Sequence, residues 1–323
     1  MRNQSALSRW DKAVDAYLSS RHALGRAFRK EEDVLRHMRA FLVRRSAKDL
    51  DQALFDEWRS QFFHRTASTR VVREITIYNF CRYRRRTEPA VFVPDRFVLA
   101  RSRPYALPTL IEAPQVARLL RYVSVRPSRL RSPLRPAVLR FAIVLLYTAG
   151  LRRGEVARLT FDDVDVHAGV LRIRASKFHK SRWVPLSRTA AGELQSYLTV
   201  RRQFDPPPSP AAPVLCTTRG RPYSAPGLSS CIKDAMRRSG IWSGAQRVPR
   251  VHDFRHSFAV AALARWYQTN ADVQSSLPKL ALYMGHVSIT STAYYLRFMP
   301  VVVALASERF ERAFGDLVQG GAP

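Results

Sequence analysis

Two short stretches in the second half of the sequence carry side chains that suit phosphate chemistry. The stretch RVHDFRHSFAV places His252, Arg255 and His256 at positions i, i+3 and i+4, which lie on one side of a helix. The stretch TAGLRRGEVARL places Arg152 just after a glycine and three residues before Glu155. A guanidinium oriented by a carboxylate can bind a phosphate through two parallel N–H donors. Taken alone, these residues fit a charged helix face or an ordinary i, i+3 ion pair equally well.

Two further stretches contain a proton donor and a nucleophile of suitable type. Lys177, in SKFHKSRWVPL, is either an exposed lysine at a hairpin tip or the acid that protonates a leaving alkoxide. In YMGHVSITSTAYYLRF, His286 follows a glycine, and Tyr294 and Tyr295 come eight and nine residues later. Aromatic pairs ordinarily belong to a core, although a tyrosine hydroxyl can also form a covalent intermediate. Both interpretations stay open at this point.

The elements that position these residues differ between the two parts of the chain. Helical spacing of apolar residues predicts a small bundle from the segments 5–20, 28–45, 51–63 and 68–86. The run CRYRRR at the end of the fourth segment fits either a solvated helix end or a phosphate-binding patch. Four prolines then interrupt the periodicity between 87 and 108. We therefore expect a helical domain at 1–92, a linker at 93–111 and a second domain at 112–323.

The second part alternates helical segments with two short strands. Helices are expected at 113–123, 136–148, 189–202, 225–239 and 252–267, and again from residue 288 onwards. The runs GVLRIRA and SRWVPLS alternate like paired strands, which puts Lys177 at or beside their turn. The fold class is therefore mainly α with a small β-sheet. The amphipathic tail Met299–Val318 is expected to cover its own core or to dock on a neighbouring molecule.

Composition limits the class of partner. The net charge of +29 and the pI near 11.2 indicate a polyanionic partner, with nucleic acid first. The excess is +11 in residues 1–110 and +18 in the remainder, so both parts are expected to grip the same partner. Three scattered cysteines give neither a disulfide framework nor a zinc site. No signal peptide or membrane-spanning run is visible, which predicts a cytoplasmic protein that makes no membrane contact.

In chain order the motifs form one pattern that resembles the tyrosine recombinases, the phage-integrase and Xer-like family. The pattern is Gly-Leu-Arg-x-x-Glu, a hairpin lysine ahead of VPL, His-x-x-Arg-His, and Gly-His followed nine residues later by a tyrosine. It runs from about Thr148 to Tyr295. The resemblance implies a helical core-binding (SAM-like) bundle followed by an α+β catalytic domain, in a prokaryotic, nucleoid-associated protein.

The resemblance also implies a role for each motif residue. Arg152 and Arg255 correspond to two catalytic arginines, and Glu155 to a supporting acid. Lys177 corresponds to the general acid and Tyr295 to the nucleophile. His252 and His286 correspond to histidines that share the nucleophile's proton or contact the phosphate. The implied reaction cuts and rejoins double-stranded DNA through a 3′-phosphotyrosine, without a cofactor or metal. The implied assembly is a tetramer on DNA, with copies of itself or with related recombinases, and the implied source is a mobile element.

The sequence departs from the family pattern in three places. Phe254 stands where leucine is usual, and Lys180 is a second lysine in the hairpin, although Lys177 is favoured. The 31 residues from Arg255 to His286 exceed the family's compact spacing, which predicts an inserted loop in WYQTNADVQSSLPKL. His256 is expected to be structural or to support the site from behind, and Tyr294 to be a buried neighbour of the nucleophile.

Three other functions remain alternatives. A type IB topoisomerase uses similar chemistry but relaxes one duplex. A catalytically silent DNA-binding regulator keeps the scaffold without the reaction. A ribonuclease or RNA-binding protein would use His252, His286 and Lys177 for acid–base work, but leaves Tyr295 without a role. The sequence does not indicate the DNA site, nor whether the reaction integrates, excises or resolves.

Overall fold

The computed structural model of the chain describes residues 2–25, 28–96, 99, 108–125, 132–174, 181–204, 209–242, 248–286, 288–298 and 300–319. Within them the chain is mainly helical with one small antiparallel sheet, which confirms the predicted fold class. The chain divides into two compact units, Met1–Ala106 and Leu107–Pro323. The division lies inside the segment 93–111, and the limits of the domains and linker given above remain a proposal.

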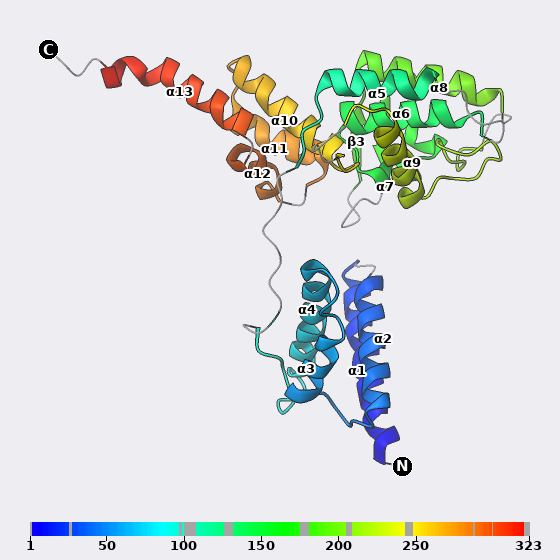
Figure 1. Cartoon of the computed structure of the whole chain (residues 1–323), viewed down its shortest axis with the longest axis vertical. Helices are drawn as coiled ribbons and strands as arrows, with labels where there is room; N and C mark the ends of the chain where they lie inside the picture. Colours follow the sequence, from blue (N-terminus) through cyan, green and yellow to red (C-terminus); the bar gives the residue numbers. More distant parts are fainter. Residues whose placement is uncertain are drawn as a thin grey trace. The chain divides into compact units, whose positions relative to one another are not determined.

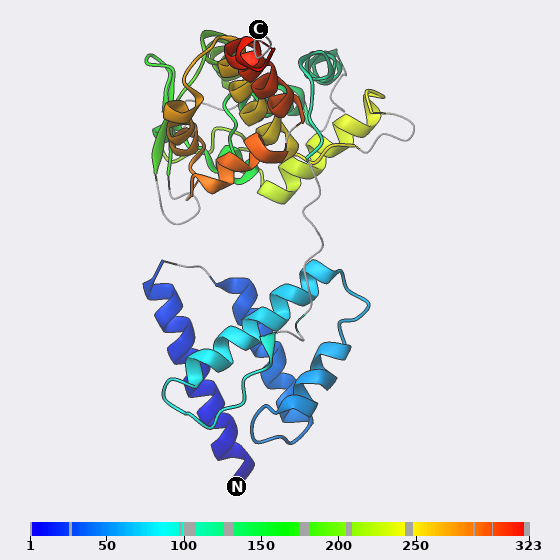
Figure 2. The same ribbon diagram turned by 90° about the vertical axis from the view of Figure 1, so that its left-hand side faces the viewer.

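The first unit is a bundle of four helices, α1 (Arg2–Ala23), α2 (Arg29–Arg44), α3 (Gln52–Ser60) and α4 (Ala67–Arg84) (Figure 1). Asp51 starts α3 because its carboxylate accepts a hydrogen bond from the Leu54 amide at 2.8 Å. Helix α4, drawn in cyan, crosses the bundle diagonally (Figure 2). The buried core is strongly aromatic and contains Trp10, Tyr17, Phe41, Phe55, Trp58 and Phe80.

The arginine run at the end of α4 has two separate roles. Arg84 is buried and donates two hydrogen bonds of 2.8 Å to the Asp49 carboxylate, so it belongs to the core of this unit. Arg82, Arg85 and Arg86 are exposed and line a hollow of about 340 Å³ together with Tyr78. Arg84 therefore fits neither interpretation of CRYRRR, whereas the three exposed arginines are compatible with both.

The second unit is built around α6 (Arg135–Thr148), in which every residue from Val138 to Leu146 except Arg140 is buried. The helices in contact with α6 are α5 (Ala113–Val125), α7 (Arg153–Arg158), α8 (Arg188–Arg202), α9 (Ala225–Arg238) and α10 (Asp253–Gln268). A short 3₁₀ helix η2 (Phe161–Asp163) follows α7. The predicted helices of this unit are present, with shifted ends.

The sheet consists of β1 (Val164–Asp165), β2 (Val170–Ile173) and β3 (Arg182–Pro185), paired antiparallel in that order. Ile173 is opposite Arg182 and Val170 is opposite Pro185, so the two alternating runs pair as predicted. Val184 and Arg182 share one face of β3, and Val184 is fully buried. The segment between the strands carries Lys177 and Lys180, and both lie outside the described residues.

The predicted inserted loop is wrong, because most of that segment forms α11 (Val273–Met284). The Asp272 carboxylate accepts a hydrogen bond from the Ser275 amide at 3.1 Å and so caps the start of the helix. Val273, Leu277 and Leu280 are buried at helical spacing. The surplus length is therefore an ordered helix packed on α10.

The chain ends in α12 (Thr290–Phe298) and α13 (Pro300–Gln319). Val302 is fully buried against α10, and Arg309 donates a hydrogen bond to the Ala271 carbonyl at 2.9 Å. The C-terminal end of the helix extends past the rest of the unit (Figure 1), and Phe310 and Phe314 are exposed. The first half of the tail thus covers its own core. Over the described part of the chain, no helix has the length and apolar character needed to span a membrane.

Candidate active site

The turn that ends α11 organises the centre of the site. Gly285 adopts a left-handed backbone with φ of +67°, and the His286 amide donates back to the Ala281 carbonyl at 2.8 Å. The Gly285 amide donates to Leu282 at 2.9 Å. These two bonds satisfy two of the terminal carbonyls of the helix and leave the next three, at positions 283 to 285, for other donors.

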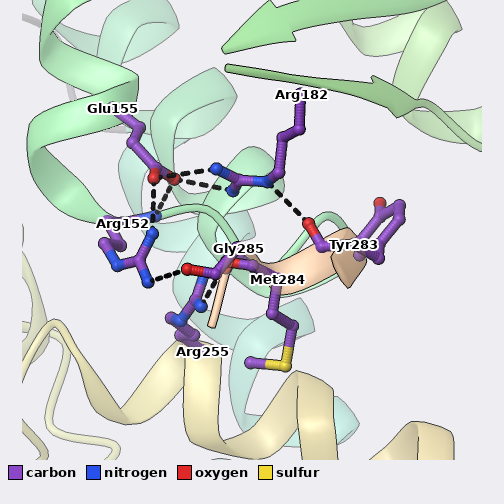
Figure 3. Close-up of polar contacts among 8 residues, drawn as sticks. Arg152, Glu155, Arg182, Arg255, Tyr283, Met284 and Gly285 are labelled. Carbon is purple, nitrogen blue, oxygen red and sulfur yellow. Dashed lines mark hydrogen bonds and ion pairs between the residues drawn. The ribbon is translucent and has the colours of Figure 1, made fainter. Parts of the chain in front are cut away.

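Three arginines from three different elements donate to these three consecutive carbonyls (Figure 3). Arg182 Nε donates to the Tyr283 carbonyl at 2.6 Å and Arg255 Nη2 to the Met284 carbonyl at 2.5 Å. Arg152 Nη2 donates to the Gly285 carbonyl at 2.7 Å. The carboxyl end of a helix carries a partial negative charge, which favours cations there. The turn therefore gathers guanidinium groups that would otherwise repel each other.

Glu155 is the carboxylate of this cluster. It accepts a hydrogen bond from the Arg152 amide at 2.9 Å and another from Arg152 Nη1 at 2.8 Å, so it both starts α7 and orients the arginine. Arg182 donates to both of its oxygens, at 3.0 and 2.9 Å. Burial opposes the charged form, but the hydrogen bonds and charge of Arg182 outweigh it and lower the pKa of Glu155 to about 2.

Arg255 lies in the first turn of α10 and is almost completely buried. Its Nη1 donates to the Gly150 carbonyl at 2.6 Å, in addition to the bond with Met284. Asp253 fixes the start of the helix by accepting a hydrogen bond from the Arg250 amide at 2.7 Å. Burial, and then the charge of Arg152, lower the pKa of Arg255 to about 9. The site is therefore short of negative charge, as a receptor for a phosphate would be.

Tyr295 lies next to this cluster through His256. Its hydroxyl is 2.7 Å from His256 Nδ1, across 39 residues of sequence, and its side chain is 3% exposed. The neighbouring Tyr294, which was expected to be buried, is only half-buried. Burial, and then the proximity of His252, lower the pKa of His256 to about 4, which keeps its ring neutral at pH 7.

The two other predicted histidines lie at the edge of the cluster. His252 is the residue before α10; it is exposed, and its ring centroid is 4.7 Å from that of His256. His286 is half-buried, and its Nδ1 is 2.7 Å from the hydroxyl of the buried Thr292. Burial, followed by the charge of Arg255, lowers the pKa of His286 to about 3.

The structure brings together six of the seven predicted residues, in one cluster at the ends of α7, α10 and α11 and on α12, and Lys177 lies outside the described residues. Sequence reasoning missed two members. His256 was assigned to a supporting position but contacts the Tyr295 hydroxyl directly. Arg182 is the second missed member. The strand pattern offered a signal for it, because Arg182 shares the inward face of β3 with Val184.

The sequence profile of the phage integrase family matches residues 110–299, which contain every member of this cluster. The chain belongs to the phage integrase family. Among curated proteins, this integrase-family chain is 34% identical to "Putative integrase/recombinase y4rE" of Sinorhizobium fredii, over 96% of both chains. It is also 28% identical to the tyrosine recombinase XerA of Thermococcus kodakarensis, over 66% of this chain and 67% of that one. These are tyrosine recombinases and integrases, the class that carries out site-specific recombination.

Solved structures share the fold of this integrase-family chain at low sequence identity. The integrase of transposon Tn1549, in complex with a circular intermediate DNA, superimposes with a TM-score of 0.67 and 15% identity, covering 93% of this chain and 99% of that one. The XerH site-specific recombinase bound to its palindromic difH substrate gives 0.63 and 17%, covering 95% and 83%. The likeness therefore extends over both units of the chain.

Proposed function

We propose that this protein is a site-specific DNA recombinase that cuts and rejoins double-stranded DNA through a covalent 3′-phosphotyrosine at Tyr295. The observation that carries the proposal is the contact between Tyr295 and His256. His256 directly follows Arg255, and Arg255 donates to the same turn as Arg152. The first turn of α10 thus places Arg255 next to the residue that contacts the tyrosine hydroxyl, and adjacent carbonyls of the α11 turn hold both guanidinium groups. A nucleophile with fixed cations is the combination that nucleophilic phosphoryl transfer needs.

The proposed cleavage step uses only side chains of this chain. The Tyr295 oxygen attacks the phosphorus, its bond to phosphorus forms, and the bond from phosphorus to the 5′ oxygen breaks. The phenolic proton passes to His256, which is neutral at pH 7 and within hydrogen-bonding distance. Lys177 supplies the proton to the departing 5′ oxygen. Arg152 and Arg255 stabilise the charge that develops on the non-bridging oxygens.

Rejoining is the reverse of this step. A 5′ hydroxyl gives its proton to Lys177 and attacks the phosphotyrosine, and Tyr295 leaves with a proton returned from His256. Because the phosphotyrosine keeps the energy of the phosphodiester bond, no cofactor is consumed. This account replaces His252 by His256 as the group that exchanges a proton with the nucleophile, because His256 is the histidine in contact with it.

Two basic hollows support DNA as the substrate. In the second unit, α9 and the start of α7 border a hollow of about 480 Å³ whose charged residues are Arg135, Arg153, Lys233, Arg237 and a single acid, Asp234. In the first unit, Arg82, Arg85 and Arg86 border the hollow at the end of α4. Arginine and lysine at such sites suit contacts to a phosphate backbone.

The relatives support the finer parts of the proposal. The Tn1549 protein is a transposon integrase bound to a circular intermediate DNA, and XerH is bound to its difH substrate. By analogy we assign this protein to a mobile element of a prokaryote, where it acts on nucleoid DNA. We further infer that it works as a tetramer on two DNA sites, with copies of itself or with sister recombinases.

A nicked suicide duplex tests the proposed chemistry. Cleavage close to the nick releases a short oligonucleotide, so the covalent protein–DNA adduct cannot be resealed and accumulates. We expect the wild-type chain and Tyr294→Phe to form this adduct and Tyr295→Phe to form none. Loss of the adduct in Tyr294→Phe, with retention in Tyr295→Phe, would move the nucleophile by one position.

The same variants separate the alternative functions. A type IB topoisomerase would relax supercoiled DNA that lacks a specific site, and this activity would also disappear in Tyr295→Phe. A ribonuclease would keep its activity in that variant. A silent regulator would bind DNA without ever forming an adduct.

A further inference from the structure

Arg182 is the member of the guanidinium cluster that neither the sequence motifs nor the proposed reaction uses. It begins β3, and its side chain is 8% exposed, compared with 23% for Arg152. All three of its nitrogens donate to the protein, two to Glu155 and one to the Tyr283 carbonyl. Its polar edge therefore faces the interior of the cluster (Figure 3), and Arg152 is the more accessible guanidinium.

Glu155 connects the two arginines. Each of its oxygens accepts one hydrogen bond from Arg182 and one from Arg152 or its amide. Arg152 by itself holds one oxygen through its amide and the other through Nη1. The planar fork of Arg182 adds a second donor to each oxygen, so two parallel N–H groups reinforce the orientation of the carboxylate.

The α11 turn closes the same network from the other side. Arg182 donates to the Tyr283 carbonyl, and Arg152 donates to the Gly285 carbonyl two residues later. A Cβ at Gly285 would lie 2.9 Å from Arg182 Nη1 and 3.4 Å from Arg152 Nη1. Both guanidinium groups therefore pack against the bare backbone of this glycine, and a displacement of one changes the space available to the other.

We propose that Arg182 is a positioning residue for the cleavage reaction: it fixes Glu155 and the α11 turn, and through them it sets the direction of the Arg152 guanidinium. The inference rests on the proposed function, in which Arg152 stabilises the negative charge on the scissile phosphate. Arg182 itself touches no reacting atom. Arg182 instead affects how well the Arg152 guanidinium is aligned with the transition state. A misplacement of such a group by about 1 Å lowers the reaction rate about a hundredfold.

Arg182→Lys is the variant that tests this role. Lysine keeps the positive charge but loses the two-pronged geometry, so Glu155 keeps an ion pair and loses its orientation. The matched control is Arg140→Lys. Arg140 on α6 forms a similar two-pronged pair with Glu193 on α8, outside the site described above. Both variants carry the same chemical change at a pair between two elements of the second unit.

The measurement is single-turnover adduct formation on two saturating suicide substrates, one with a normal scissile phosphodiester and one with a methylphosphonate. The methylphosphonate lacks the non-bridging charge, so its cleavage depends little on an aligned guanidinium. We expect Arg182→Lys to slow phosphodiester cleavage about 10- to 100-fold. We expect methylphosphonate cleavage and the Kd for DNA to change by less than about threefold. Arg140→Lys should match the wild type on both substrates.

A double-mutant cycle with Glu155→Gln identifies the route. If Arg182 acts through Glu155, the double variant should cleave the phosphodiester no more slowly than the slower single variant. Equal losses on both substrates, or multiplied losses in the double variant, would show a merely structural role and overturn the inference. A wild-type rate in Arg182→Lys would also overturn it while leaving the proposed function intact. A wild-type chain that forms no adduct would overturn both.

Discussion

The residue Gly285 meets two separate requirements, and each can be measured. Its φ of +67° disfavours any side chain, and a Cβ would also press on Arg182 Nη1 at 2.9 Å. A side chain on a left-handed backbone costs about 1–2 kcal/mol. We expect Gly285→Ala to destabilise the fold by more than this amount. We also expect it to slow adduct formation, because the arginines lose their packing surface. Urea unfolding and the suicide-substrate assay give the two quantities.

Gly240 provides the matched control for the backbone term. It has the same φ of +67°, and a Cβ there would meet no atom within 4 Å. Gly240→Ala should therefore show the backbone destabilisation alone and a wild-type rate of adduct formation. Equal destabilisation by the two substitutions, with equal rates, would show that crowding at the turn has no part in the site.

At the scale of residues, the sequence predicted the chemical groups better than their contacts. Arg152, Glu155 and Arg255 were expected together, and they do share one network. The bond between His256 and Tyr295 spans 39 residues, and no local spacing encodes such a contact. Arg182 was within reach of prediction, because an arginine on the inward face of a strand needs a buried partner.

At the scale of elements, α11 shows how a comparison of lengths can mislead. The long spacing between two motifs predicts a loop in this segment. Its own sequence contained a cap at Asp272, apolar residues at helical spacing and a glycine stop, which together predict a helix. Pro278 disfavours the interior of a helix, yet α11 runs through it. The helix is essential to the site, since its last carbonyls hold the arginines.

Helix α13 is expected to have two functional halves. Phe310 and Phe314 are 61% and 47% exposed with ring centroids 5.0 Å apart, beyond the part of the helix that packs on α10. We predict that Phe310→Ser/Phe314→Ser leaves stability within about 1 kcal/mol and leaves binding to a single DNA site unchanged. It should reduce higher-order complexes on paired sites, because we propose that these exposed rings dock on a second copy. Native gels and light scattering report the complexes.

The buried half of α13 supplies the contrast. Val302 is fully buried, so Val302→Ala should destabilise the fold by about 2 kcal/mol. The paired-site complexes should persist at temperatures where this variant is folded. Normal complexes from the double phenylalanine variant would rule out docking through this surface.

At the scale of the whole molecule, the two basic hollows predict that both units contact DNA. Each phosphate contact contributes about 0.9 to the slope of log K against log salt. We expect Arg82→Ala/Arg86→Ala in the first unit and Lys233→Ala/Arg237→Ala in the second each to lower this slope by about 1 to 2. Fluorescence anisotropy over a range of salt concentrations measures it.

Arg36→Ala/Arg39→Ala is the control for net charge. Both arginines are exposed but already paired with carboxylates, Arg36 with Glu32 and Arg39 with Asp11. This variant loses two charges and should keep the wild-type slope. An unchanged slope in the Arg82/Arg86 variant would remove the first unit from the DNA interface.

The histidines of the site predict how the stability of the free protein depends on pH. The pKa of His256 is lowered by burial from 6.5 to about 4, and that of His286 to about 3. Between about pH 6.5 and 4 the unfolded chain therefore binds more protons than the folded one. The stability that these neutral rings contribute is complete above pH 6.5 and falls as the pH drops through this window.

Unfolding of the free protein at pH 7 and pH 5 measures this effect. We expect a lower free energy of unfolding at pH 5, and a smaller difference between the two values in His256→Gln/His286→Gln. Glu155 contributes little to this difference, because its pKa is about 2 in the folded chain and 4.5 when unshifted, and both values lie below pH 5. A wild-type difference that stays unchanged in the double variant would contradict the assignment to these rings.

The identity of the atom that joins protein to DNA tests the central claim most directly. The trapped adduct from the nicked suicide duplex is digested with protease and nuclease, and the nucleotide-bearing peptide is sequenced by mass spectrometry. We predict a single phosphodiester between the Tyr295 oxygen and the 3′ end of the cut strand, with a free 5′ hydroxyl on the released oligonucleotide. A nucleotide on Tyr294, a link to the 5′ end, or no covalent link at all would contradict the account.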